Sequence, residues 1–102
     1  MTRLVLSPRT LQDLERLADF LLAADPEAAR HTGAVLISGL QILKHHPLVG
    51  RIIEHGYREL VISRGRTGYI ALYKFDVVRD VALILTIRHQ REGGYIDRDA
   101  DR

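Results

Sequence analysis

Residues 7–27 read SPRTLQDLERLADFLLAADPE and contain two helix-start signals, one helix length apart. Ser7 is a residue type favoured at a helix N-cap, and Pro8 suits the first helical position, where its missing N–H costs nothing. Asp25 and Pro26 repeat the signal. Between the signals, apolar side chains at helical spacing form one stripe: Leu11, Leu14, Leu17, Ala18, Leu21 and Leu22. The stretch therefore predicts two helices joined with almost no loop.

The two predicted helices carry different side chains on their remaining surfaces. Charged residues occupy the other side of the first helix, which we therefore expect to face solvent: Asp13, Glu15, Arg16 and Asp19. The second helix is predicted from Pro26 to about His45, before Pro47, with this apolar stripe: Ala28, Thr32, Val35, Leu36, Leu40 and Leu43. Gly33 and Gly39 weaken it by about 1 kcal/mol each relative to alanine, but would let the first helix approach closely.

Strand signals flank this helical hairpin. Residues 3–6 form a short first strand, and after an irregular connection at 47–56 three more strands are predicted at 57–63, 69–76 and 80–88. Strands joined by such short turns must be antiparallel. The order is β-αα-βββ, an α+β fold in which an antiparallel sheet carries the two-helix N-terminal hairpin on one face. We expect a single domain over residues 1–95 and a charged, frayed tail over 96–102.

Composition limits the possible classes of protein. The chain has 102 residues, 46% hydrophobic and 27% charged, which suits one globular core. It has no cysteine, so disulfides and thiolate metal sites are excluded. The apolar run near the N-terminus is too short for a signal peptide, and no segment approaches a membrane span. We expect a cytoplasmic protein that does not bind membranes.

The positive charge lies in the second half of the chain. The net charge is only +2, yet residues 51–95 carry eight Lys and Arg against five Asp and Glu. This excess mildly favours an anionic partner, either a nucleic acid or an acidic protein segment.

Common enzyme motifs are absent. The sequence has no phosphate-binding glycine loop before a helix, no G-x-S-x-G and no H-E-x-x-H. His45, His46 and His55 are the conceivable metal ligands, but no carboxylate pattern supports them, and a solvated helix terminus explains the first two. No metal and no cofactor are therefore expected.

The candidate site is the end of the last strand, where residues 86–95 read TIRHQREGGY. Arg88, His89 and Arg91 approach Arg64 or Arg66, in the preceding hairpin turn, if the register brings the strand ends together. Cations of this kind can stabilise charge on a phosphate, and acid or base chemistry could come from one of three residues: His89, Glu92 or Tyr95. From the residues alone, three alternatives remain open: a solvated strand end, a site for an anionic partner and a catalytic site for phosphate chemistry.

One further pattern concerns the middle strand. Tyr69 and Tyr73 share one face of that strand with Ala71 and Phe75, which is most often packing against the core.

Ordered motifs along the chain point to a known family. They are S-P-R-T-L-Q-D-L-E-R-L-A-D-F-L at the start, D-P-E-A-A between the helices, H-P-L-V-G-R after them, then R-E-L-V-I-S-R, I-A-L-Y-K-F and I-R-H-Q-R-E-G-G-Y. Together they resemble the RelE/ParE superfamily of bacterial type II toxin–antitoxin toxins, over about residues 2–95. The resemblance implies the β-αα-βββ fold. It also implies a plasmid-stabilisation system with a cognate antitoxin, whose acidic, amphipathic C-terminal segment wraps the toxin. Operator DNA is contacted only through the antitoxin.

The superfamily divides by target. ParE-like members poison DNA gyrase, whereas RelE-like members cleave mRNA on the ribosome. The long helical hairpin and H-P-x-x-G-R look ParE-like, and the middle region lacks the lysine-rich stretch of the RelE type, having only Lys44 and Lys74. The resemblance therefore implies a growth inhibitor that binds gyrase, with target- or antitoxin-binding residues Arg64, Arg66, Arg88 and Arg91.

Two alternatives stay open within the family. The first is a ribosome-dependent mRNA endoribonuclease, for which the catalytic residues would be Arg64, Arg88, His89 and Tyr95. The second is a degenerate member that retains antitoxin binding only. Arg64 and Arg88 are carried over most readily, because both subgroups place cations there.

Overall fold

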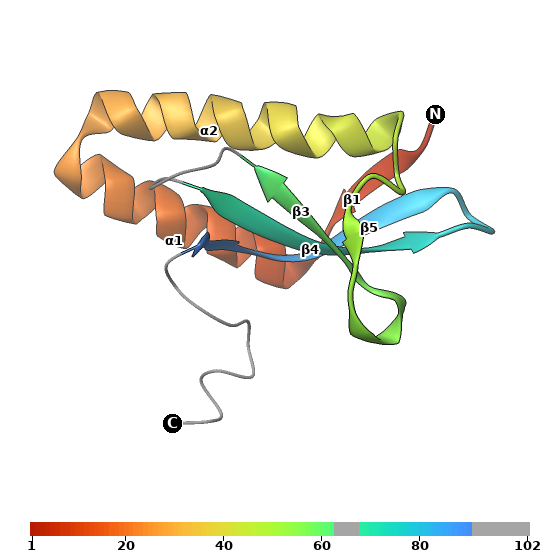
Figure 1. Cartoon of the computed structure of the whole chain (residues 1–102). Helices are drawn as coiled ribbons and strands as arrows, with labels where there is room; N and C mark the ends of the chain where they lie inside the picture. Colours follow the sequence, from red (N-terminus) through yellow and green to blue (C-terminus); the bar gives the residue numbers. More distant parts are fainter. Residues whose placement is uncertain (63–67, 91–102) are drawn as a thin grey trace.

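The computed structural model describes residues 1–62 and 68–90. Its elements follow the predicted order (Figure 1): β1 (Arg3–Leu6), α1 (Pro8–Ala24), α2 (Pro26–Gln41), the 3-10 turn η1 (Ile42–Lys44), β2 (Arg51–Ile52), the 3-10 turn η2 (Glu54–Gly56), β3 (Arg58–Ile62), β4 (Tyr69–Asp76) and β5 (Val81–His89). The β-αα-βββ prediction is confirmed. The connection expected to be irregular contains the two-residue strand β2 and the turn η2.

The strands form one sheet in the order β1-β5-β4-β3-β2. The pairs β2–β3, β3–β4 and β4–β5 are antiparallel, as predicted from the short turns. β1 differs, because it pairs parallel with β5 and forms the edge of the sheet. β5 therefore has a strand on each side along its first half, which fits its continuous apolar run.

The helix starts agree with the capping signals in the sequence. The Ser7 side chain accepts a hydrogen bond from the Thr10 N–H, and the Asp25 side chain accepts from the N–H groups of Glu27 and Ala28. The second helix was expected to run to about His45. Regular α2 ends at Gln41, and the chain then tightens into η1 before Pro47.

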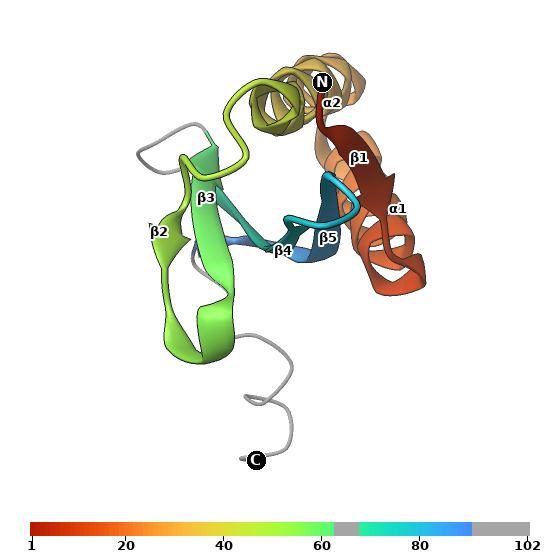
Figure 2. The same cartoon turned by 90° about the vertical axis from the view of Figure 1, so that its right-hand side faces the viewer.

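α2 covers one face of the sheet and α1 lies beside β5 (Figure 2). Leu36 and Leu40 of α2 are buried, and Gly39 approaches β3 so closely that an added Cβ would lie 2.6 Å from the Ile62 Cγ2 atom. The main buried cluster is contributed by both helices, by η1 and by the strands β3, β4 and β5: Leu17, Leu36, Leu40, Leu43, Ile62, Tyr69, Ala71, Tyr73, Ala82, Ile84 and Ile87. The predicted packing of Tyr69, Ala71 and Tyr73 into the core is confirmed.

Polar side chains attach α1 to the edge of β5. β1 ends at Leu6, so the second half of β5 needs other partners on that side. The hydroxyl groups of Ser7 and Thr10 donate to the carbonyl groups of Leu85 and Ile84, at 2.9 and 2.8 Å. Hydroxyls at the start of α1 thus replace the hydrogen bonds of a continuing strand.

Asp13 continues this row, and its predicted exposure was wrong. Its side chain is buried and accepts hydrogen bonds from the Ile87 N–H, at 3.0 Å, and from the Thr86 hydroxyl. Helical periodicity placed the carboxylate on the solvent side, but an unpaired strand edge needs acceptors as well as donors. The row therefore buries a charged residue that the apolar pattern could not identify.

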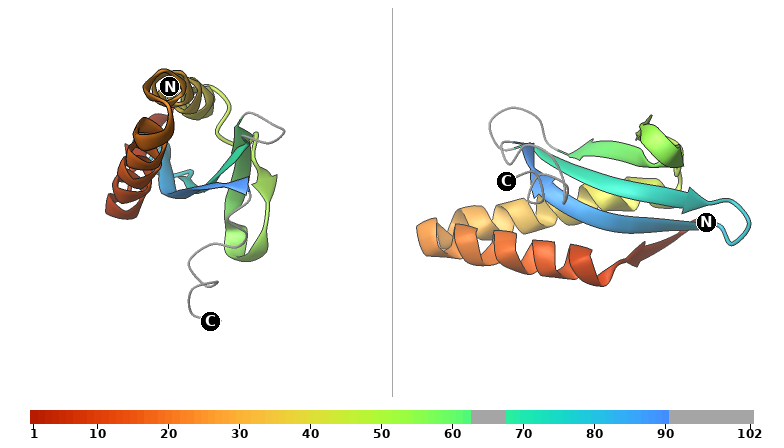
Figure 3. Two further views of the ribbon diagram at one scale, coloured as in Figure 1. Left: turned by 90° about the vertical axis from the view of Figure 1, so that its left-hand side faces the viewer. Right: turned by 90° about the horizontal axis from the view of Figure 1, so that it is seen from below.

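The opposite face of the sheet is not covered by either helix. In the view from below, β4 and β5 face the viewer and α2 lies behind them (Figure 3). A bulge between Leu72 and Tyr73 shifts the register, so that Leu72 pairs with Thr86 and Tyr73 with Ile84. No described helix is long and apolar enough to cross a membrane.

Candidate functional site

The register brings the ends of β3, β4 and β5 together. Ile62 pairs with Tyr69, Tyr69 pairs with His89, and the Gln90 N–H donates to the Gly68 carbonyl at 2.9 Å. The strand ends thus meet as the hairpin argument required. The other predicted site residues lie outside the described residues: Arg64, Arg66, Arg91, Glu92 and Tyr95.

Arg88 and His89 lie at this strand end but project from opposite faces of the sheet, as successive strand residues do. The ring of His89 meets the buried ring of Tyr69 edge-on, with centroids 5.1 Å apart. Arg88 pairs with Ile70, and its Nη1 atom donates to the carbonyls of His89 and Gln90, at 3.2 and 3.3 Å. The guanidinium therefore contacts the backbone of its own strand end.

A cleft of about 630 Å³ lies over the helix-free face, between the start of α1 and η2. Leu72 and Leu85 line it from the sheet, Arg9 lines it from α1, and His55 and Tyr57 line it from the η2 side. From the sequence, His55 was a candidate only as a metal ligand. No group of three metal-ligating side chains occurs in residues 1–62 and 68–90. The cleft combines aliphatic, aromatic and cationic groups with one carboxylate, that of Glu54.

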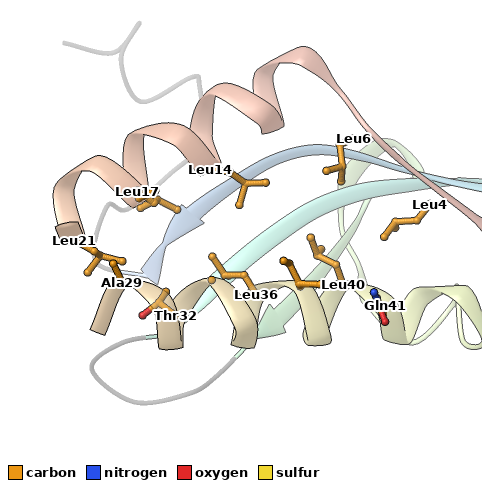
Figure 4. A pocket seen from close by; sticks show the side chains of 13 residues that line it. Leu4, Leu6, Leu14, Leu17, Leu21, Ala29, Thr32, Leu36, Leu40 and Gln41 are labelled. Carbon is orange, nitrogen blue, oxygen red and sulfur yellow. The ribbon is translucent and has the colours of Figure 1, made fainter. Parts of the chain in front are cut away.

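An apolar groove of about 320 Å³ lies between α1, α2 and β1 (Figure 4). Leu14, Leu17 and Leu21 line it from α1, and Leu4 and Leu6 line it from β1. The α2 wall is formed by Ala29, Thr32, Gly33, Leu36, Ile37, Leu40 and Gln41. Gly33 leaves this wall open, since an added Cβ would meet nothing within 4 Å. The groove offers an aliphatic binding surface with no charged side chain in its lining.

The H-P-L-V-G-R motif forms a loop fixed from inside by a buried phenol. The Tyr73 hydroxyl donates to the Pro47 carbonyl at 2.7 Å and accepts from the Gly50 N–H at 2.9 Å. Burial raises the pKa of the Tyr73 phenol, although the Gly50 hydrogen bond and the charge of Arg58 act in the opposite direction. In the sequence this motif indicated only the family resemblance, and its structural role was not predicted.

Sequence comparison decides the family. The chain matches the family model described as the ParE toxin of type II toxin-antitoxin system, parDE, over residues 4–93. The chain belongs to the ParE toxin family. It is therefore a toxin component of a type II toxin–antitoxin system and a member of the RelE/ParE superfamily, as the motifs predicted.

Two individual relatives carry names from the RelE branch of this superfamily. The chain is 35% identical over 92 residues to Toxin RelE3 of Caulobacter vibrioides, covering 90% of this chain and 98% of the relative. It is 33% identical over 70 residues to Toxin RelE1 of the same organism, covering 69% of this chain and 75% of the relative.

Solved structures share the fold of this ParE-family toxin. One belongs to the chromosomal ParDE TA system from P. aeruginosa, with a TM-score of 0.73 at 22% identity, covering 87% of this chain and 96% of that chain. Another belongs to the toxin–antitoxin complex RelBE2 from Mycobacterium tuberculosis, with a TM-score of 0.56 at 25% identity, covering 86% and 90%. At such identities the likeness supports the fold, and the target must be argued from the chain itself.

Proposed function

We propose that this ParE-family toxin inhibits growth by binding DNA gyrase and is neutralised by a cognate antitoxin. The choice of target rests on the contacts that the Arg88 side chain makes. Its guanidinium donates to two carbonyls of its own strand end, while the neighbouring His89 projects to the other face and packs on Tyr69. A cation and a base that diverge in this way do not favour in-line chemistry on one phosphate.

The apolar groove supports the second half of the proposal. A groove between two helices and a strand suits an amphipathic helix, which inserts apolar side chains at successive turns. Its volume of about 320 Å³ is larger than the roughly 150 Å³ cavity that accommodates benzene, so it has room for large aliphatic side chains. The acidic face of an amphipathic antitoxin segment would remain in water.

Ile37 allows the groove to be tested without disturbing the core, because it lines the groove yet is 59% exposed. Ile37→Asp should weaken antitoxin binding by more than about 20-fold, the loss typical of a hot-spot residue. Leu22→Asp is the matched control, since Leu22 is 49% exposed and lies outside the lining. Titration calorimetry with the antitoxin encoded in the same operon provides the measurement. Equal affinities for the two folded variants would contradict this placement.

The target is tested with purified components. Under the proposal, the toxin inhibits supercoiling by gyrase, and stoichiometric antitoxin restores it. In a parallel translation reaction the mRNA should remain intact. Normal supercoiling at toxin concentrations well above those of gyrase, from protein that arrests growth in cells, would remove gyrase as the target.

The second candidate function is the ribosome-dependent endoribonuclease. One observation favours it, because the register brings the end of β5, with Arg88 and His89, beside the two ends of the connection that carries Arg64 and Arg66. Primer extension on translated mRNA decides between the candidates. New 5′ ends that require ribosomes and disappear in Arg88→Ala or His89→Ala would establish cleavage and replace the gyrase proposal.

A further inference from the structure

The loop at residues 46–50 is held rigidly by bonds to its backbone. Besides the two bonds from Tyr73, the Arg58 Nη1 atom donates to the carbonyls of Leu48 and Gly50, at 3.0 and 2.9 Å. Within the loop, the Val49 N–H donates to the His46 carbonyl at 3.1 Å. Each of these bonds ends on a main-chain atom of the loop, so they fix its path without using its side chains.

Gly50 makes this tight closure possible. An added Cβ at this position would lie 2.6 Å from the Tyr73 ring and hydroxyl and 2.8 Å from the Glu59 carbonyl oxygen. Backbone and a fully buried ring cannot move away easily, so only glycine fits here. The loop is therefore packed against the sheet on its inner side and cannot rearrange by small shifts.

The outer side of the same loop presents aliphatic side chains to solvent. Leu48 is 57% exposed and Val49 is 54% exposed. They border a shallow hollow of about 400 Å³ together with Phe75 at the end of β4. We call Leu48, Val49 and Phe75 the apolar knob. The fold gains little from the two exposed side chains, whereas a contiguous apolar patch is characteristic of a surface that contacts another protein.

Rigidity strengthens this argument. A loop that is already ordered loses little conformational entropy when a partner binds, so more of the contact energy is left for affinity. A buried hydroxyl and a half-buried arginine that position two exposed aliphatic side chains are therefore consistent with a preorganised binding surface.

The surroundings of the apolar knob indicate the chemistry of its partner. Residues 44–59 carry Lys44, Arg51 and Arg58 against two acids, Glu54 and Glu59. The Arg51 side chain is 78% exposed, although it also contacts the Glu59 carboxylate. A complementary partner would present an apolar surface bordered by carboxylates.

We infer that the apolar knob is the surface through which the toxin docks onto its target protein, where a complementary apolar surface with carboxylates at its rim covers Leu48 and Val49. The inference rests on the proposed function, because it requires a protein target. No residue that lines the knob hollow also lines the apolar groove between α1, α2 and β1. Target docking and antitoxin binding should therefore be separable by mutation.

The test compares Leu48→Asp with Leu11→Asp in the full chain. Leu11 is the matched control because it is 53% exposed on α1, away from the loop. We expect Leu48→Asp to require more than about 20-fold higher toxin concentration for half-inhibition of gyrase supercoiling, and to lose growth arrest on induction. Its affinity for the operon's antitoxin should stay within about twofold of wild type, and Leu11→Asp should match wild type in all three measurements.

Tyr73→Phe tests the positioning of the loop by its phenol. This variant keeps Leu48 and Val49 exposed but removes the hydroxyl that holds Pro47 and Gly50. We expect a partial loss of gyrase inhibition, several-fold rather than complete, with unchanged antitoxin affinity. Circular dichroism and thermal unfolding confirm that each variant is folded.

The outcomes separate the two proposals. A folded Leu48→Asp toxin that still arrests growth like wild type overturns the apolar knob as a docking surface. Wild-type toxin that arrests growth without inhibiting gyrase contradicts the proposed target, and loss of arrest in Leu48→Asp then still supports docking on another protein. Ribosome-dependent mRNA cleavage by the wild type overturns both.

Discussion

The two helices of the hairpin attach to the same sheet by different means. α1 reaches the open edge of β5 through Ser7, Thr10 and Asp13, whose side chains bond its backbone. α2 lies on the face and packs by shape, with Leu36 and Leu40 buried and Gly39 against Ile62. A sheet edge presents unpaired N–H and C=O groups, whereas a sheet face presents side chains. The position of each helix therefore dictates the chemistry of its contact.

The largest expected effect is on the polar attachment. Asp13→Ala removes the acceptor for the Ile87 N–H and the Thr86 hydroxyl, and leaves both groups without it in a buried setting. We expect the free energy of unfolding to fall by about 3 kcal/mol, because hydrogen bonds to a charged group are strong and buried donors left unsatisfied are costly. Urea denaturation at neutral pH measures the difference.

Asp19→Ala is the control for Asp13→Ala, because Asp19 is exposed on the same helix. Its effect should stay within about 0.5 kcal/mol, as for most surface substitutions. If Asp13→Ala were as mild as Asp19→Ala, the polar attachment would be dispensable and α1 would be held by its leucines alone.

This contrast also explains which parts of the fold the sequence could predict. The helix starts at Pro8 and Pro26 and the strand at 69–76 were found because capping residues and alternating apolar residues are local signals. The parallel pairing of β1 with β5 is a long-range contact, and two-residue β2 is too short to show alternation. Asp13 was misplaced because a pattern of apolar residues cannot distinguish a buried acceptor from a solvated charge.

The candidate site was predictable to a similar extent. Hairpin turns of known length brought Arg88 and His89 to the same end of the sheet as Ile62 and Gly68, as the register shows. Their division between the two faces follows from strand geometry and could have been foreseen. The locked loop could not, because it depends on the hydroxyl of Tyr73 meeting Pro47 and Gly50, more than twenty residues away in sequence.

The stability of the apolar contact between α2 and the sheet should depend on side-chain volume instead of charge. Gly39→Ala places a methyl group 2.6 Å from the Ile62 Cγ2 atom. Because the Ile62 side chain is branched at Cβ, it cannot rotate freely away from the new methyl group, and we expect a loss of about 2 kcal/mol from overpacking. Denaturation of the single variants and of Gly39→Ala with Ile62→Ala measures the coupling, because alanine removes the Cγ atoms of Ile62 that the new methyl group would meet. If the double variant is no more stable than the sum of the two single losses in unfolding free energy predicts, the contact with Ile62 is not the cause of the loss.

The third prediction concerns the phenol that fixes the loop, a polar contact on the α2-covered side. Since the folded pKa of Tyr73 is raised above 10.0, the unfolded chain releases this proton first as the pH rises. The stability that depends on the neutral phenol is complete below pH 10 and declines between that value and the folded pKa. Tyr73→Phe should cost about 1 kcal/mol at neutral pH, where two hydrogen bonds are lost.

Unfolding in urea at neutral pH and at about pH 11 tests this assignment. The deficit of Tyr73→Phe relative to wild type should shrink at the higher pH, because only wild type still carries the ionisable buried phenol. A deficit that is constant with pH would assign the alkaline loss of stability to other groups.

The smallest effect has the opposite sign and distinguishes the two glycines of α2. Gly33→Ala adds a methyl group that meets nothing within 4 Å, so the gain in helix propensity is not opposed by overpacking. We expect the free energy of unfolding to rise by about 0.5–1 kcal/mol, whereas Gly39→Ala lowers it.

A glycine that costs stability without aiding the fold is explained if the open wall of the groove serves a partner. Gly33→Leu should then project into the groove and weaken antitoxin binding while the toxin stays folded. A Gly33→Leu toxin with unchanged affinity, measured by the same calorimetric titration as Ile37→Asp, would show that the partner does not need this space.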